Sequence, residues 1–249
     1  MLSVKSLSRS FGGVAAVSDV SFDVQKGHVH AVIGPNGAGK TTLFNLISGV
    51  YEPSSGSIYM DGQDISGCAP EQLAKRGMSR TFQNLQVCMN MTAIENVMLG
   101  AHLSSSKSLW AGILGLTRSS DRSLRSKAEE LMEYVGVGSF RGAHATELSF
   151  GVLKRLEIAR ALAAMPRLLL LDEPAAGLND SETHAMTGLI RRIAEGGTTV
   201  LLVEHDMKMV MGISDYIVVL DQGRKLAEGN AAIISQHPDV IAAYLGAEE

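Results

Sequence analysis

Two kinds of apolar pattern predict the strands of this chain. Residues 2–8 and 17–25 alternate between apolar and polar positions, as antiparallel strands with one buried face do. The unbroken apolar run at 168–171 is typical of a parallel strand that is buried on both faces. Further strands are expected at 29–33, 57–60, 78–82 and 198–203, and a hairpin at 218–220 and 225–227. The pattern predicts an α/β fold with an antiparallel flank.

Helical spacing of apolar residues predicts helices at 42–50, 70–75, 93–102, 123–135, 153–164, 181–195 and 238–245. The composition also changes between about residues 85 and 164, which favours a helical subdomain inserted in the α/β core. We therefore expect one domain over residues 1–249, with a core subdomain of 1–84 and 165–249. The Ser-rich segment around Trp110 is either a mobile surface loop or a small helix packed on a partner.

A glycine-rich segment follows the predicted strand at 29–33 and fits the phosphate-binding loop pattern of Gly, four residues, then Gly-Lys-Thr. Backbone N–H groups at such a helix start converge on phosphates, and Gly37 and Gly39 allow the close approach. Lys40 is expected to reach the β and γ phosphates, and the Thr41 hydroxyl to bind Mg²⁺. The predicted nucleotide contacts are Gly34, Pro35, Asn36, Gly37, Ala38, Gly39, Lys40, Thr41 and Thr42.

Polar residues stand at the ends of three other predicted strands. Asp172 and Glu173 follow the run at 168–171, and we expect Asp172 to support Mg²⁺ and Glu173 to act as general base on a water. Strand alternation predicts that the Glu173 side chain points away from that of Asp172. His205 is expected to face the same crevice, and Gln83 is either a surface residue or an amide directed at metal or water.

Two further positions carry weaker signals. Ser149 and Gly151 open a predicted helix, and a helix start with Ser and Gly either binds an anion or is simply a capped helix end. Phe11 lies between the first two predicted strands, where its ring either belongs to the core or stacks on an adenine base.

The overall composition limits the classes of partner. The chain has 249 residues, a formal net charge of −4 and no dense Lys/Arg run, so we expect no nucleic-acid partner. Cys68 and Cys88 are the only cysteines, which favours a reducing compartment over disulfide bonding. No apolar run is long enough to span a bilayer, so we expect a cytoplasmic chain that meets a membrane only through a partner.

Taken together, these motifs resemble the ATP-binding cassette (ABC) family over essentially the whole chain. The resemblance implies a P-loop NTPase core, with ATP and Mg²⁺ bound. It assigns Phe11 to adenine and makes Ser149 and Gly151 the signature motif. It also makes Gln83 the Q-loop residue, which binds Mg²⁺ together with Thr41 and Asp172. Glu173 and His205 become the catalytic base and the switch histidine, with residues 176–179 as the D-loop.

Longer segments, among them residues 78–102 and 168–179, resemble ATPases of Liv-type importers of branched-chain amino acids. This implies a second ATPase subunit bound head-to-tail, identical or related, at the cytoplasmic face of the membrane. It also implies membrane permease subunits and, indirectly, a periplasmic-type solute-binding protein. The alternatives are urea or amide uptake, lipid export, a soluble cassette protein without transport, and a phosphate-loop kinase. Val152, Leu153 and Asn179-Asp180 depart from the usual family pattern.

Overall fold

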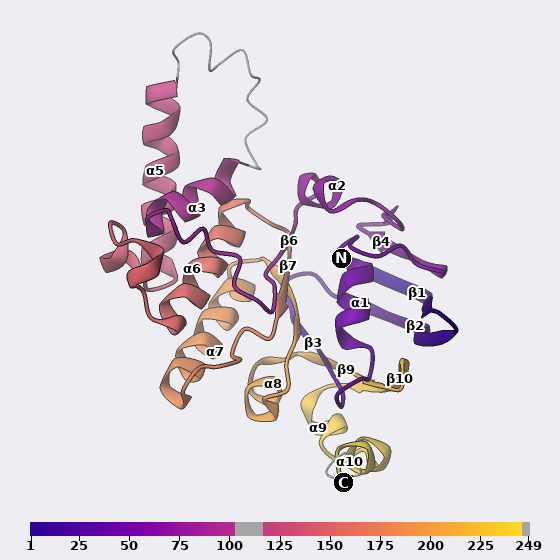
Figure 1. Cartoon of the computed structure of the whole chain (residues 1–249). Coiled ribbons are helices and arrows are strands. Elements are labelled where there is room, and N and C mark those ends of the chain that lie inside the picture. Colours follow the sequence, from indigo (N-terminus) through magenta and orange to yellow (C-terminus); the bar gives the residue numbers. More distant parts are fainter. Residues whose placement is uncertain (103–116, 246–249) are drawn as a thin grey trace.

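The computed structural model describes residues 1–102 and 117–245 and is built around a mixed sheet of six strands in the order β10–β9–β3–β8–β7–β6 (Figure 1). The strands from β9 to β6 are parallel, and β10 runs antiparallel to β9. Their bounds are β3 (Val29–Ile33), β6 (Met78–Arg80), β7 (Leu168–Asp172), β8 (Thr199–Val203), β9 (Tyr216–Asp221) and β10 (Arg224–Gly229). Trp110 lies outside the described residues.

Successive residues of the central strands are buried on opposite faces of this sheet. In β7, Leu169 and Leu171 join one apolar cluster, while Leu168 and Leu170 join a second one. The same division occurs in β3, β8 and β9, because side chains alternate between the two faces of a strand. The continuous apolar runs in the sequence are therefore explained by a sheet with a core on each side.

One face is covered by a second, antiparallel sheet and by helix α1 (Lys40–Ile47), and Leu73 of the short helix at Pro70–Lys75 joins the same apolar cluster. This sheet has the order β2–β1–β4–β5, with bounds β1 (Leu2–Phe11), β2 (Val14–Val24), β4 (Ser55–Met60) and β5 (Gln63–Asp64). Helix α1 buries Leu43, Phe44, Leu46 and Ile47 in the same cluster as residues of both sheets. The antiparallel flank predicted from the sequence is confirmed.

The other face is covered by helices, which include α3 (Ala93–His102), α5 (Thr117–Tyr134) and α6 (Phe150–Ala163) to one side of the molecule (Figure 1). The remaining helices are α2 (Pro70–Lys75), α7 (Asp180–Glu195), α8 (Met207–Ile213), α9 (Ala231–Ile234) and α10 (Pro238–Leu245), with short 3₁₀ turns at Gly138–Phe140 and Ala145–Glu147. Within residues 1–102 and 117–245, no helix is long and apolar enough to cross a membrane.

Most predicted elements occur in the structure, with differences at their ends. The strand at 29–33 and the helices at 70–75, 93–102 and 238–245 have the predicted bounds. Helix α1 begins at Lys40 rather than at residue 42, directly after the phosphate loop, and it ends before Gly49, whose φ of 73° stops the helix. Strand β6 ends at Arg80, two residues earlier than predicted, and the sequence analysis missed the short helices α8 and α9.

Candidate functional site

The parallel strands bring the predicted site residues to one edge of the sheet. The phosphate loop follows β3, Gln83 follows β6, Asp172 and Glu173 lie at the end of β7, and His205 follows β8. Because β3, β8 and β7 are neighbours and β6 pairs with β7, these carboxyl ends lie side by side. Residues distant in sequence thus form one candidate site.

The phosphate loop is held against the antiparallel sheet and the β9–β10 turn. A Cβ atom on Gly39 would lie 2.4 Å from the carbonyl oxygen of Ala16, and the φ of Gly39 is 96°, so only glycine fits there. The backbone N–H of Gly223 donates to the carbonyl of Ala38 at 3.1 Å. These contacts fix the loop at the start of α1, where unpaired N–H groups favour an anion.

Lys40 folds over this loop. Its Nζ donates to the carbonyl oxygens of Gly34 at 2.7 Å and Pro35 at 2.9 Å, which uses two of its three N–H donors. Burial lowers the pKa of Lys40, and the charge of Glu173 opposes that shift. The ammonium group and the Glu173 carboxylate therefore lie close enough to interact across the site.

Glu173 has an unusual backbone conformation. Its φ is 48°, in the left-handed region that costs a non-glycine residue about 1–3 kcal/mol. Because β7 ends at Asp172, Glu173 lies beyond the strand, and strand alternation does not determine the direction of its side chain. Its carboxylate accepts a hydrogen bond from Gln83 Nε2 at 3.1 Å, and its carbonyl accepts one from Lys154 Nζ at 3.2 Å.

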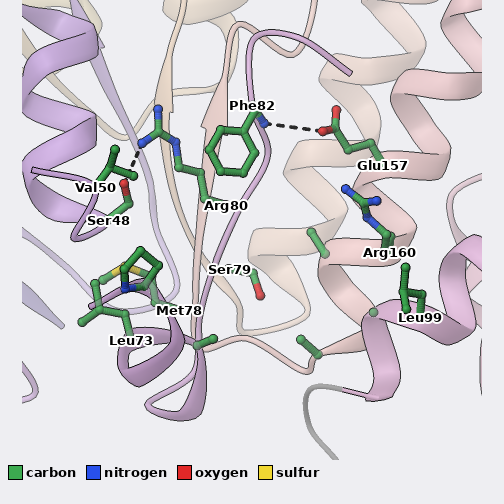
Figure 2. A pocket seen from close by; sticks show the side chains of 15 residues that line it. Ser48, Val50, Leu73, Met78, Ser79, Arg80, Phe82, Leu99, Glu157 and Arg160 are labelled. Atoms are coloured by element: carbon green, nitrogen blue, oxygen red, sulfur yellow. Dashed lines mark hydrogen bonds between the residues drawn. The ribbon is translucent and has the colours of Figure 1, made fainter. Parts of the chain in front are cut away.

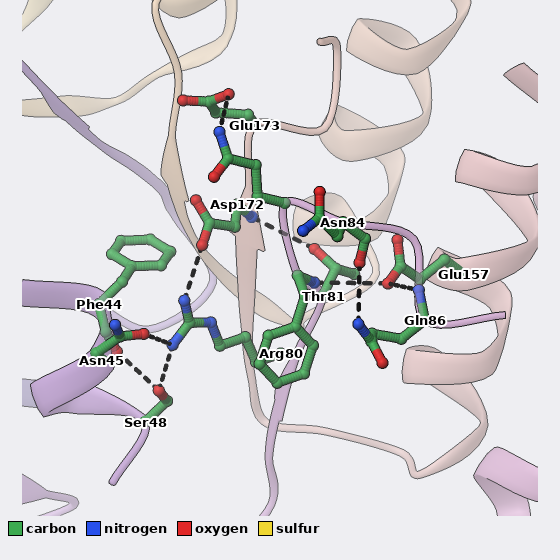
Figure 3. Close-up of polar contacts among 12 residues, drawn as sticks. Phe44, Asn45, Ser48, Arg80, Thr81, Asn84, Gln86, Glu157, Asp172 and Glu173 are labelled. Carbon is green, nitrogen blue, oxygen red and sulfur yellow. Dashed lines mark hydrogen bonds and ion pairs between the residues drawn. The ribbon is translucent and has the colours of Figure 1, made fainter. Parts of the chain in front are cut away.

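Asp172 is buried and forms an ion pair that the sequence analysis missed. Its Oδ2 accepts a hydrogen bond from Arg80 Nη2 at 2.8 Å, which leaves its other oxygen for a further ligand (Figure 3). The carboxylate of Asp172, the Thr41 hydroxyl and the amide oxygen of Gln83 are hard oxygen donors, the kind Mg²⁺ prefers beside phosphates. The donor chemistry therefore fits Mg²⁺.

His205 is exposed, and the buried Glu204 beside it sets the local backbone. Glu204 accepts hydrogen bonds from the backbone N–H of Ala175 at 2.7 Å and of His205 at 3.0 Å. Burial raises the pKa of Glu204, and the three backbone N–H bonds that it accepts oppose this shift. Glu204 thus joins the turns after β7 and β8. A charged residue directly after a largely apolar strand is the signal that the sequence analysis overlooked.

Glu157 performs a similar task for the segment that contains Gln83. It is 2% exposed on α6, and its carboxylate accepts from the backbone N–H groups of Phe82 at 3.5 Å and Gln86 at 3.3 Å. Burial raises the pKa of Glu157, again against the effect of these hydrogen bonds. The sequence analysis did not single out this residue.

Ser149 and Gly151 lie together at the start of α6, apart from the phosphate loop. A Cβ on Gly151 would lie 2.3 Å from Oε1 of Glu182, and one on Gly177 would lie 2.9 Å from the Phe150 ring, so this turn packs against residues 177–182. Ser149 occupies the N-cap position, but its side chain makes no capping hydrogen bond. In the described part of the chain, no hydrogen bond or ion pair joins Ser149 or Gly151 to the phosphate loop.

The two departures after the signature glycine have a structural explanation. Val152 and Leu153 are 6% and 8% exposed, and both join the apolar cluster on the helical face of the main sheet. Apolar residues at these positions are therefore core residues of α6. Asn179, the other departure, caps α7 by accepting a hydrogen bond from the backbone N–H of Glu182 at 3.0 Å.

Phe11 ends β1 and is 40% exposed. Its ring lies edge-on to Tyr51, with centroids 5.3 Å apart, and the guanidinium of Arg9 is 4.8 Å from its centroid. Phe11 therefore belongs to a small surface cluster, and part of its ring is open to solvent. Phe11 is therefore not a core residue.

A groove of about 380 Å³ lies between the core and the helices α3 and α6 (Figure 2). Exposed apolar side chains line it from three elements, namely Val50 after α1, Phe82 after β6 and Leu99 on α3. Arg80, Glu157 and Arg160 supply its charged lining. The groove thus adjoins both the segment of Gln83 and the ion pair of Asp172.

Comparisons with known proteins agree with this geometry. A family profile described as ABC transporter matches residues 17–176, and one described as branched-chain amino acid ATP-binding cassette transporter matches residues 224–249. The chain is 45% identical over 249 residues to the high-affinity branched-chain amino acid transport ATP-binding protein BraF of Pseudomonas aeruginosa, covering 99% of this chain and 98% of BraF. It is 42% identical over 250 residues to LivG of Escherichia coli K12, which has the same description, with the same coverage.

A solved structure shares the fold. The dimeric structure of a post-hydrolysis state of an ATP-binding cassette bound to ADP and Pi superposes with a TM-score of 0.79 at 25% identity, covering 93% of this chain and 99% of that one. The predicted fold class and the resemblance to Liv-type ATP-binding proteins are both confirmed. The chain belongs to the ABC transporter family.

Proposed function

We propose that this chain is the ATP-binding and ATP-hydrolysing subunit of an importer for branched-chain or related amino acids. The observation that carries the proposal is the 45% identity to BraF over nearly the full length of both chains. The profile match at residues 224–249 favours amino acids over the alternatives of urea or amide uptake and lipid export. The chain would work at the cytoplasmic face of a membrane, as a peripheral subunit.

In this proposal, residues 34–42 hold the triphosphate of ATP, and Phe11 contacts the adenine. Lys40 has one N–H donor beyond the two that bind the loop carbonyls, and it directs this donor to the phosphates. Thr41, Asp172 and Gln83 hold Mg²⁺ through oxygen atoms. The bound ion neutralises charge that develops on the transferred phosphoryl group.

Hydrolysis requires a base for the attacking water. Glu173 takes this role, with its carboxylate oriented by the hydrogen bond from Gln83 and its backbone held by Lys154 and by the N–H bond to Val203. His205, exposed beside the same edge, positions the γ-phosphate.

The site is completed by a second ATPase subunit, either another copy or a related chain. The separation of Ser149 and Gly151 from the phosphate loop within one chain supports this, because head-to-tail pairing would place one subunit's signature on the other's phosphates. The dimeric cassette that shares the fold supports pairing of two ATPase subunits. The exposed hydroxyl of Ser149 and the start of α6 would then face the γ-phosphate.

The groove beside Phe82 receives a helix of the membrane permease in our proposal, and residues of about 85–164 act as the helical subdomain that moves with it. Three exposed apolar side chains in the groove fit the apolar face of a helix. The adjoining segment, residues 83–91, connects the groove to Glu173 through the hydrogen bond that Gln83 donates.

Cysteine cross-linking tests this docking surface. In a variant that lacks Cys68 and Cys88, a cysteine at Met89, which is 42% exposed in the segment that follows the groove residue Phe82, should cross-link to the permease with a yield that changes with nucleotide. A cysteine at Gln222, exposed in the far hairpin, is the matched control and should not be captured. Capture at Gln222 with none at Met89 would place the permease elsewhere.

Transport tests the function itself. The chain should co-purify with permease subunits, and proteoliposomes that contain the complex, ATP and the solute-binding protein should accumulate labelled leucine. The Glu173→Gln complex should not accumulate it. Uptake of urea instead of leucine, or purification of the chain without any membrane subunit, would contradict the proposed importer.

A further inference from the structure

Arg80 occupies a position that none of the roles above explains. It ends strand β6, three residues before Gln83, and its side chain is only 7% exposed. Nη2 donates to Asp172 Oδ2 at 2.8 Å, while Nη1 donates to Asn45 Oδ1 at 2.7 Å and Ser48 Oγ at 2.6 Å (Figure 3). One guanidinium group therefore joins the end of β7 to the last turn of α1.

Such a pair is a weak device for stability alone. Removing two charges from water costs several kcal/mol, and apolar residues of similar volume often stabilise a core as well or better. Arg80 Nε also lacks a hydrogen-bond partner, so the guanidinium is not fully compensated for its burial. The free-energy cost of burying the Arg80–Asp172 pair is explained if the geometry of the pair serves the candidate site.

That geometry fixes the carboxylate of Asp172. A planar guanidinium held at Nη1 by Asn45 and Ser48 cannot rotate freely, so its Nη2 sets the position of Oδ2. The backbone N–H of Asp172 is held as well, by Thr81 Oγ1 at 3.3 Å. The remaining carboxylate oxygen is thereby presented in one orientation.

We propose that Arg80 is a positioning residue that fixes Asp172 for the Mg²⁺ complex of ATP; this rests on the proposed ATP-binding function. α1, which begins with Lys40 and Thr41, contributes Asn45 and Ser48 to the same network. The network thus holds the elements that carry Thr41 and Asp172, both expected Mg²⁺ ligands, in a fixed relation.

Arg80 also connects this network to the groove. Its guanidinium lies 5.1 Å from the ring centroid of Phe82, whose side chain is exposed, and both residues line the groove (Figure 2). The ion pair with Asp172 therefore adjoins the groove. Asp172, an expected Mg²⁺ ligand, is thus linked to the groove through one buried side chain, that of Arg80.

The test compares nucleotide affinity with and without Mg²⁺. Wild type, Arg80→Met and Arg80→Lys are titrated with a fluorescent ATP analogue in Mg²⁺ and in EDTA. For Arg80→Met we expect affinity in EDTA within about twofold of wild type, but a loss of tenfold or more in affinity in Mg²⁺. Arg80→Lys keeps the positive charge but not the planar guanidinium with its two donor nitrogens, and it should lose a smaller part of the Mg²⁺-dependent affinity.

Arg167→Met is the matched control, because Arg167 also pairs with an aspartate, Asp61, but far from the site and in a more exposed position. It should bind the analogue as wild type does in both buffers. Equal losses for Arg80→Met with and without Mg²⁺, or no loss at all, would overturn the proposal. If Arg80→Met does not fold, Arg80→Lys decides by the same comparison. A wild type that binds the analogue in neither buffer would overturn the proposed ATP-binding function itself.

Discussion

Replacing Glu173 with glutamine is expected to slow ATP hydrolysis by a factor of about 10² to 10⁴, the usual effect of removing a positioned proton acceptor. Glutamine has nearly the same shape and still accepts the hydrogen bond from Gln83, so the site should stay intact. Lys40, Thr41 and Asp172 would still hold the nucleotide. The variant should therefore bind ATP normally and accumulate as an ATP-bound dimer, which single-turnover hydrolysis and size-exclusion chromatography measure.

Two comparisons make this result specific. Glu195→Gln is the matched control, since Glu195 is exposed at the end of α7, which leads into the start of β8 at the opposite end of the sheet from the site. This variant should hydrolyse ATP at the wild-type rate. Lys40→Ala should fail differently, because it removes a charged donor from the phosphates. Hydrogen bonds to charged groups contribute about 1.5–3 kcal/mol, so ATP affinity should fall roughly 10- to 150-fold.

Replacing Ser149 with arginine is expected to abolish most hydrolysis while leaving ATP binding by the single chain intact. The side chain of Ser149 is exposed and makes no capping bond, so arginine there should not disturb folding. In the proposed dimer, however, this residue faces the other subunit's phosphates, and a bulky side chain would hold the two subunits apart. Equilibrium binding, turnover and dimer fraction measure the three parts of the prediction.

Ser123→Arg is the control for this substitution, because Ser123 is exposed on α5 and has no place in the proposed interface. It should dimerise and turn over ATP as wild type does. If Ser149→Arg kept wild-type turnover under conditions where wild type dimerises, the shared-site proposal would be wrong.

The parts of the site that the sequence predicted are those encoded in short contiguous segments. The phosphate loop is one such segment, and Asp172 could be placed because a buried parallel strand ends at the edge where ligands bind. The fold class and the gathering of site residues at one edge of the sheet could therefore be predicted from local sequence patterns and the general rules of α/β sheets.

The parts that the sequence did not predict depend on partners that are distant along the chain. Arg80 and Asp172 are 92 positions apart, and Glu157 is 71 positions from Gln86, so neither contact has a local signal. The left-handed backbone of Glu173 also follows from the turn after β7, which strand alternation does not describe. A charged residue in or directly after a predicted strand, as at Arg80 and Glu204, was the usable indication.

The nucleotide that remains bound to Glu173→Gln tests the central claim most directly. After incubation of this variant with Mg²⁺ and ATP, the dimer fraction should contain ATP almost exclusively, whereas wild type treated in the same way should contain ADP. ADP in the variant at the wild-type level would contradict the role of Glu173 as the base and leave positioning of the nucleotide as the whole of the catalysis.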